Sequence, residues 1–496
     1  MSRHIVEEFT PFSKSLLWKL QIKAYQEFAL KAWTEKGVPF YLTSSPLTAK
    51  SFAWLSSAYI EDLLIQNERI EIIFFDLGAG TGRFAYLFLK FFQELSAPFK
   101  DRISFKYVMT DISEENLLFL ENHFRLRPFF DAGIADTALF FHNQKEPIKL
   151  RKSHQTLDQL NNAILIANYF FDTIPQELYR VTGGIKEKGF VKLTLPENKK
   201  GDFISDWISD LEMESKFEEF LEEDGKASEL LDYYSNHLDN VPFLMPLGAF
   251  EVLEGFQNIS KKPLLFLACD QGAATLDQVR HEKWIRLDKH GTFSIPVSYH
   301  ALNLYLKNRG GFGLLPKLPD PKFLSMTGLL NGEEKDFPHL IQAFNVTIAD
   351  FEPKDYWLLI GEMENLEITS LKLLLLLLKL GGFDPAIFFT FFPLIRKALE
   401  LDKGNRKELL NALEEVSENF YPVSKSERDL WQNLGVIAFE AAFFNHAINY
   451  FEEAIRWGGE TKELLQNLAA AFFKIGDMEK AKACQQKAKL LRVDEC

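Results

Sequence analysis

Residues 70–95, IEIIFFDLGAGTGRFAYLFLKFFQEL, decide the fold of this 496-residue chain. The stretch begins with a short apolar run that ends in Asp76, which is typical of a buried strand. From Arg83 onward the apolar residues follow helical spacing. Glycines at 78, 80 and 82 lie between the two, where they let the backbone turn sharply and approach a bound molecule. Because a helix start offers unpaired N–H groups and a partial positive charge, the turn predicts a ligand-binding loop.

Other short apolar runs repeat this pattern and also end in a polar residue. They occupy residues 105–111, 162–168 and 263–270. Helical stretches separate the runs at 70–76, 105–111 and 162–168. The sequence therefore predicts an α/β fold with a parallel, doubly wound sheet. Ligands bind beyond the carboxyl ends of such strands. We therefore expect the last residues of the four runs at one ligand-binding edge: Asp76, Asp111, Asn168 and Asp270.

The spacing of the glycines narrows the ligand class. A dinucleotide-binding turn would have its third glycine at the position of Arg83, and no Lys-Ser or Lys-Thr pair indicates a P-loop. The G-x-G-x-G spacing with an acid two residues before it resembles the first motif of Rossmann-like S-adenosylmethionine-dependent methyltransferases. This resemblance implies that Asp76 faces the methionine amino group of S-adenosyl-L-methionine. It also implies that the loop formed by Gly78, Gly80 and Gly82 wraps this cofactor.

Two further acids receive a cofactor-binding role from the same resemblance. Asp111 corresponds to an acid that accepts hydrogen bonds from both ribose hydroxyls, although it could instead be the N-cap of the next helix. Asp136 lies where the family often has an acid that contacts adenine, although it could be an ordinary turn residue.

The third run continues as Asn-Tyr-Phe-Phe-Asp-Thr-Ile-Pro over residues 168–175. This stretch resembles the Asn-Glu-Phe-Phe-Asp-Ala-Leu-Pro segment of the MidA-like methyltransferases, which include an arginine methyltransferase involved in assembly of mitochondrial complex I. Residues 264–272 and 291–311 extend the resemblance. It implies that Asn168 and Asp172 are catalytic residues next to the methyl acceptor. Tyr169 stands in place of the family's Glu and Gln271 in place of its Tyr, so the resemblance does not extend to arginine specificity, and arginine and other nitrogen acceptors both stay open. The expected acid near Ser294 is also replaced.

The remaining chain suggests flanking domains. Residues 1–60 have helical patterns and predict a cap on the methyltransferase domain, or a lid over its substrate pocket. That domain is expected over residues 61–325, with an acidic helical insertion near 196–245.

Residues 350–496 show only helical patterns and predict an all-α domain. A shift of 34 residues aligns Trp431 with Leu465 and Gly435 with Ala469. This spacing resembles the tetratricopeptide repeat, with the clearest repeats over 428–461 and 462–495. Further degenerate helices are expected beneath them at 355–425, since two repeats bury too little apolar surface alone.

Composition limits the class of partner and the compartment. The formal net charge is −14, which disfavours a broad grip on nucleic acid or on an anionic membrane. No apolar run is long enough to span a membrane, and the widely spaced cysteines fit a reducing cytoplasm. No histidine motif indicates a metal site.

Together these features predict a methyltransferase that acts on a nitrogen of a protein side chain, while the repeats recruit the protein substrate or partner. Two alternatives stay open. The chain could be a cofactor-binding scaffold or assembly factor without catalysis, or it could methylate a small molecule.

Overall fold

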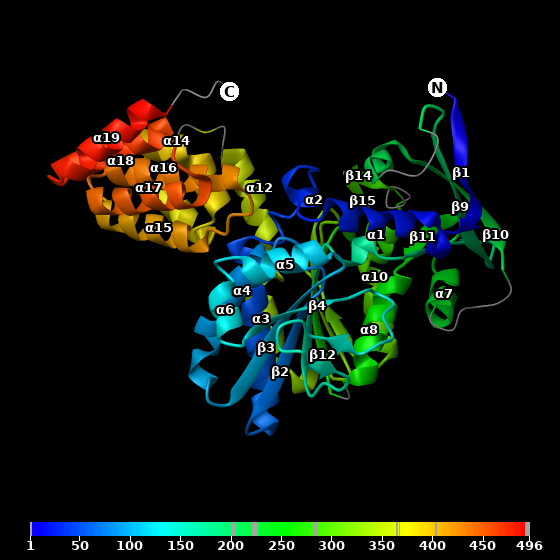
Figure 1. Cartoon of the computed structure of the whole chain (residues 1–496). Coiled ribbons are helices and arrows are strands. Elements are labelled where there is room, and N and C mark those ends of the chain that lie inside the picture. Colours follow the sequence, from blue (N-terminus) through cyan, green and yellow to red (C-terminus); the bar gives the residue numbers. More distant parts are fainter. Residues whose placement is uncertain are drawn as a thin grey trace. The chain divides into compact units, whose positions relative to one another are not determined.

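The structure is a computed structural model that describes residues 2–199, 205–220, 227–260, 262–281, 286–363, 366, 368–401 and 404–491. The chain divides into two compact units. The first comprises residues 1–44 and 48–354, and the second comprises residues 45–47 and 355–496. Each unit is described by itself below, with the element labels of Figure 1.

A seven-stranded sheet forms the centre of the first unit (Figure 1). Five of its strands are parallel, and β18 runs against its neighbours β12 and β17, so the sheet is mixed. The predicted α/β class is confirmed, and the four apolar runs of the sequence are β2, β3, β7 and β12. In spatial order the strands are β17 (Phe312–Leu314), β18 (Leu324–Leu330), β12 (Leu264–Asp270), β7 (Ala163–Asn168), β2 (Ile70–Asp76), β3 (Ile103–Asp111) and β4 (Ala135–Leu139).

Helices cover both faces of this sheet. Adjacent residues of a strand point to opposite faces, so neighbouring residues of β2 pack against different helices. Phe74 packs its ring against Phe88 of α4, with ring centroids 5.2 Å apart. The next residue, Phe75, packs on Phe256 of α8 at 4.8 Å. The helices of the unit include α3 (Pro46–Gln66), α4 (Arg83–Ser96), α5 (Glu114–Asn122), α6 (Arg127–Asp131), α8 (Leu247–Ile259), α9 (Leu276–Val279), α10 (Tyr299–Asn308) and α11 (Pro338–Thr347).

A second, antiparallel sheet corrects two predictions. Its strands are β1 (Arg3–Pro11), β9 (Ile185–Pro196), β8 (Glu177–Thr182), β11 (Val241–Met245) and β10 (Glu212–Glu219), where β10 pairs with β9. The insertion near 196–245 was expected to be helical, but among its described residues only α7 (Ser228–Ser235) is an α-helix, beside strands β10 and β11. The N-terminal residues were also expected to be helical, and they begin with a strand instead.

The strand β10 shows why the pattern was misread. Met213 and Phe217 lie four residues apart and both pack on the apolar cluster beneath the sheet, while Glu212, Glu214 and Glu218 alternate with that face. Alternation of this kind is the signal of a half-buried strand. The high acidic content concealed it, because glutamate is depleted in strands.

The segment after β1 packs a helix against the first unit. Helix α1 (Leu16–Phe28) begins at Ser15, whose side chain accepts a hydrogen bond from the Leu17 N–H at 3.2 Å. The side chain of Gln21 exchanges two hydrogen bonds with the backbone of Phe293, which belongs to the short strand β15 (Thr292–Ser294). A short helix α2 (Lys31–Thr34) follows. The two bonds of Gln21 anchor α1 to β15, and apolar residues of α1 share a cluster with residues of the antiparallel sheet.

The second unit consists of helices over its described residues. Gly435 of α16 lies against Phe451 of α17 so closely that a Cβ would collide with the ring, which explains the small residue at this repeat position. Helices α16 to α19 form two pairs that fall within the predicted repeats 428–461 and 462–495. The helices are α12 (Pro353–Met363), α13 (Leu371–Leu380), α14 (Pro385–Leu401), α15 (Arg406–Asn419), α16 (Asp429–Glu440), α17 (Phe444–Gly458), α18 (Lys462–Lys474) and α19 (Met478–Leu490).

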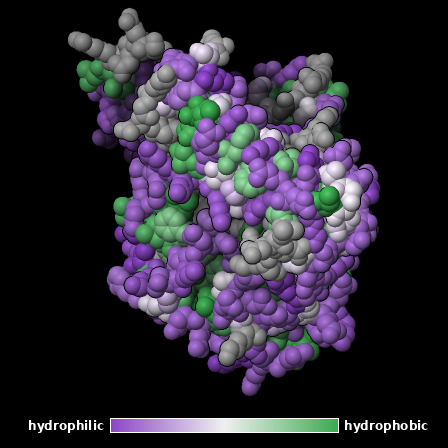
Figure 2. Space-filling view, turned by 90° about the vertical axis from the view of Figure 1, so that its right-hand side faces the viewer, coloured by the Kyte–Doolittle hydropathy of each residue, from purple (hydrophilic) through white to green (hydrophobic). Residues whose placement is uncertain are grey.

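The surface shown in Figure 2 is mostly hydrophilic, with hydrophobic residues in separate patches. Over the part of the chain that the structure describes, no helix is long and apolar enough to cross a membrane.

Candidate functional site

A cavity lies at the carboxyl ends of the parallel strands, in the first unit. It is bordered by the ends of β2, β3 and β7 and by the residues that follow β4. The chain passes from β2 outward to β3 and β4 and then returns to β7 on the other side of β2, so the strand order reverses at this point. Reversal points of this kind are where open α/β sheets bind their ligands.

The glycine loop turns from β2 into α4 along one side of this cavity. Its glycines have φ angles of +69° (Gly78), +54° (Gly80) and +77° (Gly82), in the left-handed region that side chains other than glycine rarely adopt. The Ala79 N–H donates to the carbonyl of Thr110 at 2.8 Å, so the neighbouring strand fixes the loop. The predicted glycines are therefore required by the backbone path.

Asp76 ends β2 and is buried, with 3% of its surface exposed. The Tyr107 hydroxyl donates to Asp76 Oδ2 at 3.0 Å, and the Thr110 hydroxyl donates to the Asp76 carbonyl at 2.9 Å. Burial raises the pKa of Asp76 to about 7, and the Tyr107 hydrogen bond and nearby Asp111 act as smaller influences. A carboxylate that is desolvated in this way is strongly stabilised by a cation placed beside it.

Asp111 ends the neighbouring strand β3 on the same cavity. Its Oδ1 accepts from the Ser113 N–H at 2.9 Å, and its Oδ2 accepts from the Asn116 amide at 3.2 Å. Ser113, not Asp111, is the N-cap of α5, so the alternative capping role is excluded. Burial raises the pKa of Asp111 to about 6, against several hydrogen bonds that lower it.

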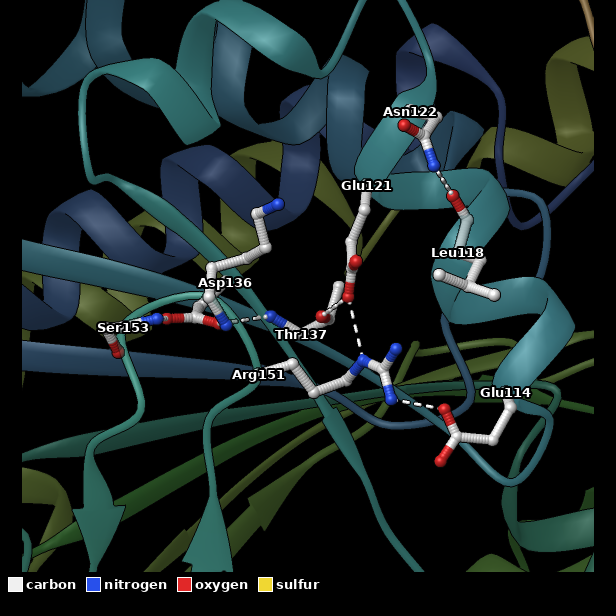
Figure 3. A network of polar contacts seen from close by, with 9 residues as sticks. Glu114, Leu118, Glu121, Asn122, Asp136, Thr137, Arg151 and Ser153 are labelled. Atoms are coloured by element: carbon white, nitrogen blue, oxygen red, sulfur yellow. Dashed lines mark hydrogen bonds and ion pairs between the residues drawn. The ribbon is translucent and has the colours of Figure 1, made fainter.

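Asp136 lies outside the lining of this cavity, so its position does not support the predicted contact with adenine. It is the second residue of β4 and is not among the described residues that line the cavity. Its carboxylate accepts backbone N–H groups from Thr137, Lys152 and Ser153 at 2.8–3.0 Å (Figure 3). The misplacement arose because the stretch ADTALF starts a strand here, so the ligand-binding end comes several residues later.

The residues at that later position, Phe140, Phe141 and His142, do line the cavity. Burial lowers the pKa of His142 to about 4, so this imidazole is neutral near pH 7. The sequence reasoning missed these residues, although the end of the strand run would have indicated them.

Asn168 ends β7, the neighbour of β2, and lines the same cavity as the glycine loop. Neither its Oδ1 nor its Nδ2 has a hydrogen-bond partner, and both atoms are shielded from solvent. The following residue, Tyr169, has a φ of +47°, a strained conformation for a side chain of this size. Strain and an unpartnered buried amide at the same place are features of a binding site.

Asp172 is buried but is not among the described residues that line the cavity. Its N–H donates to Asp270 Oδ2 at 3.1 Å, and its carboxyl group hydrogen-bonds Asp270 and Ser294. Burial raises the pKa of both carboxyl groups, and their proximity raises that of Asp270 further. Both pKa shifts favour the protonated form of this pair, and the structure pairs Asp172 with Asp270 rather than with the cavity.

The N-terminal helices form one wall of the cavity. This position agrees with a lid over the pocket, which the sequence offered as the alternative to a cap. Trp18, Gln21 and Tyr25 of α1 line the cavity on one stripe of that helix. Trp33 of α2 lies 5.9 Å from the Tyr25 ring, measured between ring centroids, and also faces Gly80. The stripe was visible as helical periodicity, but periodicity alone does not distinguish a cavity wall from a core face.

Comparison with known families identifies this part of the chain. Residues 55–274 match the model of a family described, by inference, as S-adenosyl-L-methionine-dependent methyltransferases. This segment is a methyltransferase domain. The match includes the glycine loop, Asp76, Asp111 and Asn168, and it confirms the predicted enzyme class and cofactor. Residues 463–492 match a tetratricopeptide repeat, which covers α18 and α19 and confirms the C-terminal repeat.

Similarity to individual proteins is remote. No curated protein matches the chain. A structure from Burkholderia thailandensis, named by inference a methyl transferase and bound to S-adenosyl-homocysteine, has 14% identity and a TM-score of 0.41 over 62% of this chain and 74% of its own. An uncharacterized protein from that organism has 11% identity and a TM-score of 0.42 over 66% and 90%. The pyocyanin biosynthetic protein PhzM has 11% identity and a TM-score of 0.26 over 56% and 54%. At these scores the similarities support no conclusion about chemistry.

Proposed function

We propose that the methyltransferase domain transfers a methyl group to a nitrogen of a protein side chain, and that the tetratricopeptide helices recruit the substrate or a partner. The observation that carries this proposal is the unpartnered Asn168 amide, which lines the same cavity as the glycine loop. A buried amide without partners costs about 1–3 kcal/mol for each group, so a bound molecule is expected to supply them.

The cavity suits S-adenosyl-L-methionine in the arrangement expected from the sequence. Asp76 is a desolvated carboxylate that a ligand ammonium group would stabilise. Asp111 can accept hydrogen bonds from a ribose diol, since a carboxylate has several lone pairs beyond those used by Ser113 and Asn116. The glycine loop offers close backbone approach at the start of α4. Asp136 is excluded from this set by its position.

The catalytic contribution of the chain is mainly positioning. The cofactor supplies a methyl group already activated by its positive sulfur, so the protein must align the acceptor nitrogen with it and exclude water. In this proposal Asn168 holds the acceptor, and Trp18 and Tyr25 of α1 line the same cavity. Asp172 acts through its buried pair with Asp270, which supports the backbone just after the acceptor-binding residues.

Titration calorimetry and methyl transfer test the proposal together. The full chain should bind S-adenosyl-L-homocysteine and should transfer tritium from methyl-labelled cofactor into protein from a cell extract. Asn168→Ala should retain the binding and lose the transfer. Label that enters only small molecules would favour the small-molecule alternative, and absent cofactor binding would overturn the enzyme reading.

A scaffold role is the second candidate, because Tyr169 replaces the acid of the MidA-like pattern and a repeat domain can recognise a partner without catalysis. It predicts that a transfer-deficient Asn168→Ala chain restores the cellular function of a deletion strain fully. The MidA-like relation and the cytoplasmic location remain predictions.

A further inference from the structure

The acceptor end of the cavity has one unusual polar group, the side chain of Asn168. Its Oδ1 and Nδ2 are both buried and both unpartnered, so they form an acceptor and a donor side by side. Two other polar side chains that line the cavity already have hydrogen-bond partners. Gln21 exchanges both hydrogen bonds with Phe293, and the Thr173 hydroxyl donates to the Phe170 carbonyl at 2.8 Å.

Few charged side chains line the cavity that contains Asn168. Among the described residues that line the cavity, the carboxylates are Asp76 and Asp111, which belong to the proposed cofactor end, and there is no Lys or Arg. Asp172 and Asp270 are bonded to each other. Much of the remaining lining is aromatic or apolar, and it includes Trp18, Ile22, Tyr25, Tyr169, Phe170 and Ile174.

We propose that the methyl acceptor is a primary carboxamide, the side chain of a glutamine or asparagine in a protein. A carboxamide is the neutral complement of Asn168. One of its N–H groups would donate to Asn168 Oδ1, and its carbonyl oxygen would accept from Asn168 Nδ2. This pairing fixes the amide plane and directs the nitrogen toward the methyl donor. The inference rests on the proposed function and names its substrate class.

Charged acceptors fit this end of the cavity less well. An arginine guanidinium has five donors and no acceptor, so it would leave Asn168 Nδ2 unpartnered. Its charge would also be buried without a carboxylate, which is strongly unfavourable. The aromatic walls suit a flat neutral group that stacks between rings.

The reaction balances without a further reagent. The carboxamide nitrogen forms a bond to the methyl carbon while the bond from that carbon to sulfur breaks, and the sulfur keeps the electron pair and becomes neutral. The methylated amide is then a strong acid and releases one N–H proton to solvent water. The products are an N-methyl carboxamide, a thioether and a proton.

Acid hydrolysis of labelled protein distinguishes the acceptors. The full chain is incubated with S-adenosyl-L-methionine that carries ¹⁴C in its methyl group. The acceptor is protein extracted from cells that lack this chain. Hydrolysis of N-methyl carboxamides releases volatile labelled methylamine, whereas label on arginine, lysine or histidine stays with the amino acid. We expect the protein-bound label as methylamine. Label on a basic amino acid, or label lost as methanol from an ester, would overturn the carboxamide but leave protein methylation standing. No label in protein, despite cofactor binding, would overturn both.

A matched pair of variants tests the Asn168 contact. Asn168→Asp removes the amide donor with little change of shape, so methylamine release should fall on the order of a hundredfold while affinity for S-adenosyl-L-homocysteine persists. Asn308→Asp makes the same chemical change at the end of α10, where the amide donates to exposed Glu229, and should transfer normally. Unchanged methylamine release from Asn168→Asp would contradict the proposed pairing.

Discussion

The indole of Trp33 lies directly over Gly80: a Cβ placed on that glycine would be 2.9 Å from Cζ2 of the indole. The N-terminal segment is thus seated on the loop proposed to hold the cofactor. The Arg83 guanidinium, at the start of α4, lies 4.7 Å from the centre of the Tyr41 ring and adds a cation–π contact to this segment. Residues far apart in sequence therefore close one side of the methyltransferase cavity.

This relationship predicts that Gly80→Ala reduces affinity for S-adenosyl-L-homocysteine by at least roughly tenfold, because the new methyl group meets Trp33 and the φ of +54° is strained for alanine. Calorimetry measures the change. Gly255→Ala is the matched control, since that glycine of α8 has open space around it and should bind normally. Restoration of binding in Gly80→Ala combined with Trp33→Ala would assign the loss to the indole, and unchanged affinity in Gly80→Ala alone would contradict the prediction.

Cofactor affinity should also depend on pH through Asp76. Its pKa is raised by burial to about 7 in the ligand-free protein, so at pH 6 most molecules must release a proton before the carboxylate can bind an ammonium group. Affinity for S-adenosyl-L-homocysteine is therefore expected to rise between pH 6 and pH 8. Calorimetry in buffers of different ionisation enthalpy should detect proton release on binding near pH 7.

Two controls isolate the carboxylate in that experiment. 5′-Methylthioadenosine lacks the amino acid arm, so its affinity should change less between pH 6 and pH 8. Asp76→Asn should weaken binding of the full ligand and flatten its pH dependence. A pH dependence that persists in Asp76→Asn would assign the proton to another group, of which Asp111, with a pKa raised to about 6, is the neighbour.

The sequence predicted the parts of this site that depend on local pattern. Strand ends and glycine spacing placed Asp76, Asp111 and Asn168 at one edge, because parallel buried strands leave few alternatives for their carboxyl ends. The wall that contains Trp33 could not be predicted in the same way. Its position depends on packing between residues more than 40 positions apart, such as Gly80, and on the bonds of Gln21 to Phe293.

The prediction for Asp136 failed for a different reason. The strand was predicted correctly, but Asp136 lies near its start and the ligand-binding end comes several residues later. We expect Asp136→Asn to lower the free energy of unfolding by about 1–3 kcal/mol, because three backbone N–H groups would lose a charged acceptor. Affinity for S-adenosyl-L-homocysteine should stay within about twofold of the unmodified chain, as measured on folded protein. A large loss of affinity without a loss of stability would restore the adenine-contact role.

The tetratricopeptide helices should be sensitive to the size of residue 435. Gly435→Leu would force α16 away from Phe451 and is expected to destabilise the second unit by roughly 1–3 kcal/mol. Gly361→Ala, on α12 with open space around it, should be neutral or stabilising. Thermal unfolding measures both, and cofactor affinity of the first unit should not change. A Gly435→Leu chain as stable as its parent would contradict close helix packing at this repeat position.

The buried pair of Asp172 and Asp270 predicts the pH dependence of stability. Burial raises both pKa values in the folded state, that of Asp172 to about 7, so the folded protein holds protons that the unfolded chain releases near pH 4. Stability from this pair is therefore fully present below pH 4 and is lost as pH rises toward 7. Asp270→Asn cannot ionise, so its melting temperature should fall less between pH 5 and pH 8 than that of the unmodified chain. Asp131→Asn changes an exposed acid and should leave the slope unchanged. Parallel slopes for Asp270→Asn and the unmodified chain would show that the pair does not hold a shared proton.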